Sequence, residues 1–388
     1  MVDRWPSGDP LRIGALFSRT GVTADVETTE LKGTLLAIKE INEAGGVRGR
    51  PIEAVAYDPC SDPKMFKRLA ETLMDKDGIR TIVGCYMSTT RKAIVPVVEK
   101  RRGLLLYPIL YEGFEYSPNC ICTGAVPNQN TIPLARYLLE NFGARFYLIG
   151  SNYVYAYEQN RVMTDYVRVC RGKVLEERYL NLNSSRADFD AVVADIVKQQ
   201  PDVIFSTVVG DQTTHLYQAY RAAGLDPARM PIASLTTGEN EVVAMGSEAA
   251  EGHITAATFF EVMDRPAARR FVAAYKDMHG ADAPVPATAE AAYFQMHMLA
   301  RAMAEAGSDD PEIFRSYLVG RDFDAPQGAV RVDPENNHTY IWPRVARIEA
   351  SGRFRIVLDA TRPVKPDPYF VSSNTSSWDT GVTFVRVG

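Results

Sequence analysis

The stretch TIVGCYMS (residues 81–88) decides the fold class, because a short apolar run passes directly into the start of a helical pattern. Its first three residues predict a buried strand, and Ser88 begins a helix that we expect to continue to residue 100. A second apolar run, LLLY (residues 104–107), follows one helix later. Short strands that alternate with helices predict a parallel sheet with helical crossovers, which is an α/β fold.

The same alternation extends outward on both sides. Before this stretch the predicted strands are residues 11–18 and 52–57, and the predicted helices are 33–44 and 62–77. A second series restarts near residue 127, with predicted strands at 145–150, 173–179, 203–209 and 231–235. Two series of similar size indicate a duplicated architecture. Beyond residue 252 the order changes to a strand at 254–260, helices at 267–279 and 287–306, β-like segments from residue 320, and a polar tail at 361–388 that we expect to run over the surface.

Composition narrows the class of protein. A chain of 388 residues is long enough for two or three domains with sizeable cores. The net charge of -5 and the pI near 5.7 give no sign of binding to nucleic acid or to an anionic membrane. Residues 1–10 lack the apolar core of a signal peptide, and no run approaches the roughly 20 apolar residues of a membrane span. We therefore expect a cytoplasmic protein.

The cysteines form an odd, unpatterned set, namely Cys60, Cys85, Cys120, Cys122 and Cys170. Such a set indicates free thiols in a reducing compartment. Cys120 and Cys122 share one face of a predicted strand, but no second pair with zinc-site spacing exists. We expect neither a metal site nor a cofactor.

Catalytic motifs are missing. The chain has no phosphate-binding loop, no H-E-x-x-H and no G-x-S-x-G, and its five histidines are scattered. Cys85 lies at a strand-to-helix turn, where a thiol can be activated, but a buried structural cysteine suits this position equally. Because no base lies nearby in the sequence, packing is the favoured interpretation and no catalytic residue is predicted.

Hydroxyl groups gather instead at the predicted strand ends. Ser88 lies at a helix start, where backbone N–H groups favour an acceptor atom, although simple helix capping would also explain a serine there. Tyr107 ends the following strand, while Tyr155 and Thr236 follow strands of the second series. Tyrosine hydroxyls need partners when they are buried. Hydroxyls and amides without concentrated charge predict a small neutral ligand, such as a short amide or urea.

Several stretches in order also resemble one known family. They are VGCYMSTTRKAIVPVVE (83–99), YEGFEYSPN (111–119), PNQN (127–130), FSTVVG (205–210), PIASLTT (231–237) and DAPQGAVRV (324–332). Residues 11–369 resemble the AmiC-like amide-sensing negative regulators of bacterial amidase operons, in the type I periplasmic binding-protein superfamily.

The resemblance implies two Rossmann-like lobes with parallel sheets, joined by three crossovers, with the ligand in the cleft between them. It implies a first lobe of residues 1–126 and 253–327 and a second of 127–252 and 328–388. The positions that it marks as ligand contacts are Ser88, Tyr107 and Tyr155, then Tyr86, Val208 and Thr236. Glu239 lies near where amino-acid-binding relatives place an acid, so the resemblance suggests that it recognises an NH2 group.

The chain departs from the family at one position of the expected site. AmiC-like proteins have Tyr-Pro-Thr-Pro after the fourth strand, whereas this chain has Ile109 in place of the threonine. Ile109 removes a hydroxyl and adds apolar bulk, so we expect a different size preference or affinity.

The family function implies a sensor that binds an amide and controls an RNA-binding antiterminator protein. One alternative is the substrate-binding component of an ABC importer for amides, urea or branched-chain amino acids. Another is an amide hydrolase that uses Cys85, which a test of Cys85→Ala would reveal. The sequence decides neither the ligand nor whether the chain forms a homodimer.

Overall fold

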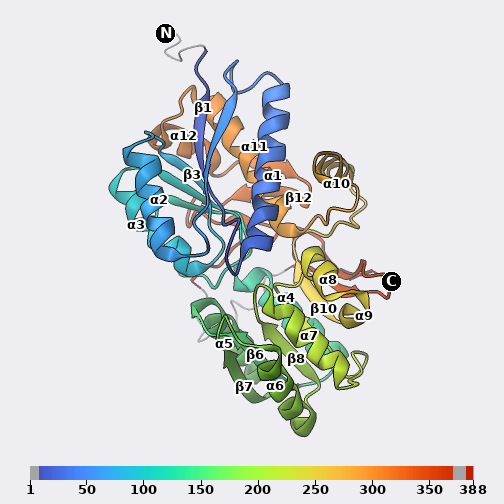
Figure 1. The fold of residues 1–388 in the computed structure, drawn as a ribbon. Helices are drawn as coiled ribbons and strands as arrows, with labels where there is room; N and C mark the ends of the chain where they lie inside the picture. Colours follow the sequence, from blue (N-terminus) through green and yellow to red (C-terminus); the bar gives the residue numbers. More distant parts are fainter. Residues whose placement is uncertain (1–7, 370–381, 388) are drawn as a thin grey trace. The chain divides into compact units, whose positions relative to one another are not determined.

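The computed structural model describes residues 8–369 and 382–387 (Figure 1). The first seven residues and much of the polar tail lie outside this range, so the expectations for them stay predictions. The chain divides into two compact units. Unit 1 comprises Met1–Leu110, Glu115–Ala125 and Arg265–Tyr340, and unit 2 comprises Tyr111–Phe114, Val126–Asp264 and Ile341–Gly388.

Two of the expected lobe boundaries differ from this division. The chain returns to unit 1 at Arg265, not at residue 253, and it re-enters unit 2 at Ile341, not at residue 328. The first difference arises because the strand β10 (Ile254–Ala257) pairs on both sides within the sheet of unit 2. The second arises because β12 (Gly328–Val332) pairs with its sequence neighbours in a small sheet of unit 1.

Unit 1 is built around a five-stranded parallel sheet of order β2-β1-β3-β4-β5. Its strands are β1 (Leu11–Leu16), β2 (Ile52–Tyr57), β3 (Thr81–Gly84), β4 (Leu104–Tyr107) and β5 (Cys120–Cys122). The helices are α1 (Ala24–Glu43), α2 (Pro63–Asp75), α3 (Ser88–Lys100), α10 (Pro266–His279), α11 (Ala287–Ala306) and α12 (Pro311–Leu318). A small antiparallel sheet joins β11 (Asp322–Ala325), β12 and β13 (Thr339–Tyr340).

Helices cover both faces of this sheet, and Figure 1 shows α2 beside α3 and α1 beside α11. The α1–α11 contact is close because Gly33 has no side chain. A Cβ atom at Gly33 would lie 2.2 Å from the backbone oxygen of Ala289. The helix α2 begins where Asp62 accepts a hydrogen bond from the Lys64 amide and Pro63 occupies the first turn, as the sequence predicts.

Unit 2 holds an eight-stranded sheet of order β16-β15-β14-β10-β9-β8-β6-β7. Its first strands are parallel: β6 (Arg145–Ser151), β7 (Lys173–Leu180), β8 (Val203–Thr207), β9 (Ile232–Ser234) and β10. Antiparallel strands extend it, namely β14 (Arg344–Ile348), β15 (Phe354–Ala360) and β16 (Phe384–Arg386). The helical elements are η1 (Pro127–Gln129), α4 (Thr131–Asn141), α5 (Val154–Val169), α6 (Arg186–Gln199), α7 (Gln212–Ala222), α8 (Glu239–Met245) and α9 (Ser247–Ala250).

The fold is therefore an α/β fold of two units with parallel sheets, as the sequence predicts. In such sheets the carboxyl ends of the parallel strands lie at one edge, and ligands bind at that edge. The candidate residues of each unit follow the carboxyl ends of its strands.

Candidate functional site

The turn between β3 and α3 has a strained backbone. Gly84 has a φ of 147°, and a Cβ atom there would lie 2.1 Å from the backbone oxygen of Leu16. Cys85 follows with a φ of 70°, unusual for a residue with a side chain, and its amide donates a 3.0 Å hydrogen bond to the same oxygen. Strain of this kind persists where surrounding structure fixes the backbone, and it gathers at functional sites.

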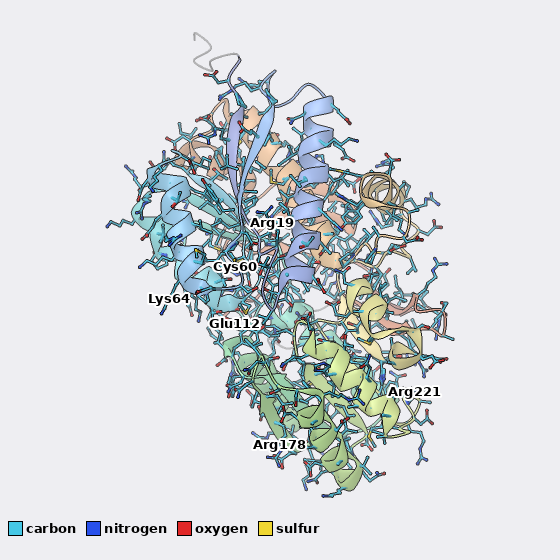
Figure 2. The ribbon with its side chains drawn as sticks, viewed as in Figure 1. Arg19, Cys60, Lys64, Glu112, Arg178 and Arg221 are labelled. Atoms are coloured by element: carbon cyan, nitrogen blue, oxygen red, sulfur yellow. The ribbon has the colours of Figure 1, made fainter. Side chains whose placement is uncertain are left out.

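The neighbouring loops at this edge are also tied together. Asp58, just after β2, accepts 3.0 Å hydrogen bonds from the amides of Arg19 and Cys60. Figure 2 labels Arg19 and Cys60 in the loops that follow β1 and β2. The edge of unit 1 that carries the candidate residues is thus built from interlinked turns.

Three predicted residues come together in unit 1, and with Ile109 we call them the unit 1 cluster. Tyr86 and Ser88 follow β3, and Tyr107 ends β4, the parallel neighbour of β3. The Tyr107 hydroxyl donates a 2.6 Å hydrogen bond to the backbone oxygen of Tyr86. All three side chains are buried. Met87, not Ser88, occupies the N-cap position of α3, so helix capping does not explain the serine.

Arg91 is a member of this site that the sequence reasoning missed. Its side chain is fully buried, its Nη1 lies 3.4 Å from the Ser88 Oγ, and its guanidinium carbon lies 4.9 Å from the centre of the Tyr107 ring. Glu115 accepts a 3.0 Å hydrogen bond from its Nε. The signal in the sequence is the spacing, since residues i and i+3 share a face of a helix.

Ile109 lies two residues beyond β4 and is buried. Its backbone packs closely on Gly124, where a Cβ atom would lie 2.0 Å from the Ile109 carbonyl carbon. The backbone at Ile109 is therefore fixed. Contact of its side chain with a ligand stays a prediction.

Unit 2 places Tyr155, Val208, Thr236 and Glu239 at the carboxyl ends of neighbouring parallel strands, and we call them the unit 2 cluster. Tyr155 follows β6, in the first turn of α5. Its hydroxyl is buried and has no hydrogen-bond partner among the residues that the structure describes. Burial, together with the charge of Glu112, raises the pKa of Tyr155, so the hydroxyl stays protonated. A buried hydroxyl without a partner is suited to a ligand.

Val208 and Thr236 are linked directly. The Thr236 hydroxyl donates a 2.9 Å hydrogen bond to the backbone oxygen of Val208, and this bond joins the ends of β8 and β9. The Thr236 amide donates a 3.0 Å hydrogen bond to the Ser234 hydroxyl. These bonds fix the loop, and the Thr236 oxygen can still accept a hydrogen bond.

Glu239 begins α8, and its Oε1 accepts a 2.9 Å hydrogen bond from the Glu261 amide. Burial raises the pKa of Glu239 to about 8. At neutral pH the carboxyl group is mainly protonated, so it can donate a hydrogen bond to a neutral amide or accept one from it.

The structure also bears on the suggestion that Cys85 is a nucleophile. All five cysteines are free, and burial raises the pKa of the Cys85 thiol well above its usual value. A protonated, buried thiol is a poor nucleophile. Within residues 8–369 and 382–387, no group of three or more His, Cys, Asp or Glu side chains is placed to hold a metal ion.

Comparison with known proteins gives the family. The family model described as the periplasmic binding protein domain matches residues 11–375. The chain belongs to this family. As a member of it, the chain is a binding protein and not an enzyme.

Its relatives in this periplasmic binding-protein family include receptors for amino acids. A leucine-, isoleucine-, valine-, threonine- and alanine-binding protein of Pseudomonas aeruginosa is 23% identical over 85% of this chain and 88% of its own length. The branched-chain amino acid transporter substrate-binding protein of Streptococcus pneumoniae, solved with isoleucine, has a TM-score of 0.79 at 21% identity. That alignment covers 92% of this chain and 100% of the other.

A further similar structure carries a different ligand. The solute-binding protein of an ABC transporter from R. palustris, solved with benzoate, has a TM-score of 0.82 at 16% identity and covers 92% of this chain and 98% of its own. At these identities the structures show the type I fold alone. Among the described helices of this chain, none combines the length and apolar character that crossing a membrane requires.

Proposed function

We propose that this periplasmic binding-protein family member is a receptor for a small neutral solute with a carbonyl group, such as a short aliphatic amide or urea. The observation that carries the proposal is the buried Tyr155 hydroxyl, which has no partner among the described residues. Together with Ser88 and Tyr107 it offers hydroxyl groups at strand ends. The proposal that one ligand contacts both clusters comes from the family resemblance.

The chemistry of the clusters supports a neutral ligand. Ser88 and the backbone N–H groups at the start of α3 suit a carbonyl oxygen, because they are donors at a positive helix end. The Tyr107 hydroxyl donates its proton to the backbone oxygen of Tyr86, so any hydrogen bond between this hydroxyl and an NH2 group is one that the Tyr107 oxygen accepts. Glu239, whose pKa burial raises to about 8, can donate a hydrogen bond to a neutral amide or accept one from it.

We propose that the chain serves an ABC importer, which is the first alternative to the amide sensor that the sequence analysis gives. The support comes from its relatives, since the matched P. aeruginosa protein is an amino-acid-binding protein and the R. palustris structure is an ABC transporter component. Binding of the ligand would favour one arrangement of the two units, by no more than its differential affinity for the two states.

A second candidate is the cytoplasmic amide sensor that controls an RNA-binding antiterminator. The sequence stretches at residues 83–99 and 111–119 favour it, because they resemble the amide-sensing regulators and the first of them includes Ser88 of the unit 1 cluster. The acidic pI near 5.7 is compatible with a basic protein partner. On this reading, the ligand would release the antiterminator.

Isothermal titration tests the ligand class. Acetamide, propionamide, butyramide and urea are compared with isoleucine and benzoate. We expect heat with at least one neutral compound. Heat with isoleucine or benzoate alone would contradict the neutral ligand, and no heat with any compound at millimolar concentration would contradict the receptor.

A gene deletion in the native host separates the two roles. Loss of uptake of the labelled ligand supports the importer receptor. Unchanged uptake, together with amidase expression that no longer requires an amide, would instead support the sensor.

A further inference from the structure

Asn130 occupies the N-cap position of α4 in unit 2, at the end of the PNQN stretch (127–130). Its side-chain oxygen Oδ1 accepts a 2.6 Å hydrogen bond from the Thr131 amide. Because only the oxygen of a side-chain amide can accept from an N–H group, this bond fixes the orientation of the amide. The side chain is only 3% exposed, and its nitrogen Nδ2 has no hydrogen-bond partner among the residues that the structure describes.

Side-chain contacts connect Asn130 to the helix that carries Tyr155. The Thr131 hydroxyl oxygen lies 3.1 Å from the Asn130 Oδ1 and 2.5 Å from the Gln159 Oε1. Gln159 lies one turn after Tyr155 on α5, and residues four apart share a face of a helix. All four side chains are buried within unit 2. The start of α4 therefore lies beside the start of α5, which follows the carboxyl end of β6.

Two buried polar groups near these helix starts, the Asn130 Nδ2 and the Tyr155 hydroxyl, lack partners in the described part of the chain. Folded proteins pair the great majority of their buried polar groups, so such groups indicate a partner that the described chain does not supply. The two groups differ in what they can bind, because an amide nitrogen only donates, whereas a tyrosine hydroxyl can donate or accept. A primary amide offers matching groups, namely a carbonyl oxygen and an NH2 group.

We propose that Asn130 is a further ligand-binding residue of unit 2, and that its Nδ2 donates a hydrogen bond to the carbonyl oxygen of the bound solute. This inference rests on the proposed receptor function and adds to it the residue of unit 2 that recognises the carbonyl group. Tyr155, as a donor or an acceptor, contacts the same polar end of the solute. An uncharged donor suits an uncharged carbonyl group, because neither partner has to be stripped of the hydration of an ion.

Matched oxygen and sulfur compounds test the inference. In thioacetamide and thiourea a sulfur atom, which is a weak hydrogen-bond acceptor, replaces the carbonyl oxygen of acetamide and urea. In each pair the measured quantity is the ratio of the dissociation constants of the sulfur and oxygen compounds, from isothermal titration. We expect the wild-type chain to prefer the oxygen compound. Asn130→Ser should reduce the ratio by about threefold to tenfold, because serine keeps a capping oxygen and has no amide nitrogen.

Two further variants separate ligand contact from folding. Asn130→Asp also keeps the cap but puts an oxygen in the place of Nδ2, so we expect a larger loss of affinity for the oxygen compound than in Asn130→Ser. Thr164→Val is the control, since the Thr164 hydroxyl is likewise buried on α5 and unpartnered within the described ranges. It lies more than two turns after Tyr155, and we expect no change in the ratio. Thermal unfolding of each variant checks that it is folded.

The outcomes distinguish this inference from the function on which it rests. Heat with the oxygen compound but an unchanged ratio in folded Asn130→Ser would overturn the role of Asn130, leave the receptor function standing and indicate a buried water beside Nδ2. Undiminished affinity in folded Asn130→Asp would overturn it as well. A ratio that falls equally in Thr164→Val would show a general effect of changes within unit 2 and would also overturn it. Absence of heat with all four compounds would refute this ligand class, and the inference with it.

Discussion

The Tyr107 hydroxyl donates a 2.6 Å hydrogen bond to the backbone oxygen of Tyr86, and this bond ties together the ends of two parallel strands. It gives Tyr107 a fixed orientation and commits its only proton. The phenol oxygen is therefore an acceptor in the unit 1 cluster, which is the role that an amide NH2 group requires.

Tyr107→Phe should weaken both the fold and the ligand complex. Loss of the bond to Tyr86 should lower the free energy of unfolding by about 0.5–1.5 kcal/mol. Loss of the acceptor should raise the dissociation constant of an amide about tenfold. Chemical denaturation and titration measure the two effects. Tyr220→Phe is the control, because that hydroxyl also donates to a backbone oxygen, that of Met230, and should affect stability alone.

Tyr155→Phe should act in the opposite direction on stability. Its buried hydroxyl has no partner among the described residues, so removing it should stabilise the ligand-free protein by about 1 kcal/mol. The same change should weaken ligand binding. Tyr275 is a matched control, since its buried hydroxyl is likewise unpartnered within residues 8–369 and 382–387. Tyr275→Phe should also stabilise the protein, and weaker binding in this variant would contradict a specific role for Tyr155.

The sequence predicts the local part of this site well and the non-local part poorly. The bounds of β3, α3 and β4 follow from apolar runs and helical spacing within 27 residues (81–107), and the structure has them at almost the same residues. The lobe boundary near residue 253 is wrong because β10 takes β14 as a partner, and β14 begins about 90 residues later. Pairing over such a distance leaves no periodic signal in the strand itself.

The burial of Arg91 is another feature of the site that local sequence patterns do not predict. A cation on an amphipathic helix is normally solvated, and its sequence neighbours give no reason to bury it. It forms an ion pair with Glu115, which lies beyond β4 in a segment without regular secondary structure. The ends of the predicted strands indicate the hydroxyl residues of the unit 1 cluster. The ion pair of Arg91 and Glu115 can be found only from the tertiary structure.

Glu239 should make stability depend on pH. Its pKa in the folded state is about 8, above the ordinary value of 4.5, so the folded protein keeps a proton that the unfolded chain releases. The resulting stabilisation is complete below about pH 4.5 and is lost as the pH rises to about 8. His253 has the opposite effect, because burial lowers its pKa to about 3 and stability therefore rises with pH. This rise ends near pH 6.5, where the unfolded chain also loses the histidine proton.

The contribution of Glu239 to the pH dependence of stability is therefore measured by comparing the wild type with Glu239→Gln. We expect the free energy of unfolding of the wild type to fall relative to that of Glu239→Gln between about pH 6.5 and 8. Denaturation of both proteins across this range measures the difference. Parallel curves would show that the carboxyl group is already ionised at pH 6.5.

Gly84→Ala should disrupt unit 1. The new Cβ atom would lie 2.1 Å from the Leu16 oxygen, and the backbone has a φ of 147°, so both sterics and conformation oppose the change. We expect a loss of about 3 kcal/mol or more in stability, together with loss of ligand binding. Gly78→Ala is the control, since its φ is 70° but nothing lies within 4 Å of the new atom. It should cost only about 1–2 kcal/mol and leave binding intact.

Ile109→Thr tests the one position where the chain departs from the family it resembles. Ile109 is buried two residues beyond Tyr107, and its backbone is held against Gly124. Threonine is smaller and carries a hydroxyl, so affinity for short amides should change relative to that for longer ones. The measurement is titration with acetamide, propionamide and butyramide. Ile121→Thr is the control for lost packing, because Ile121 is equally buried in β5 but lies within the sheet. An unchanged order of affinities in Ile109→Thr would show that this side chain does not contact the ligand.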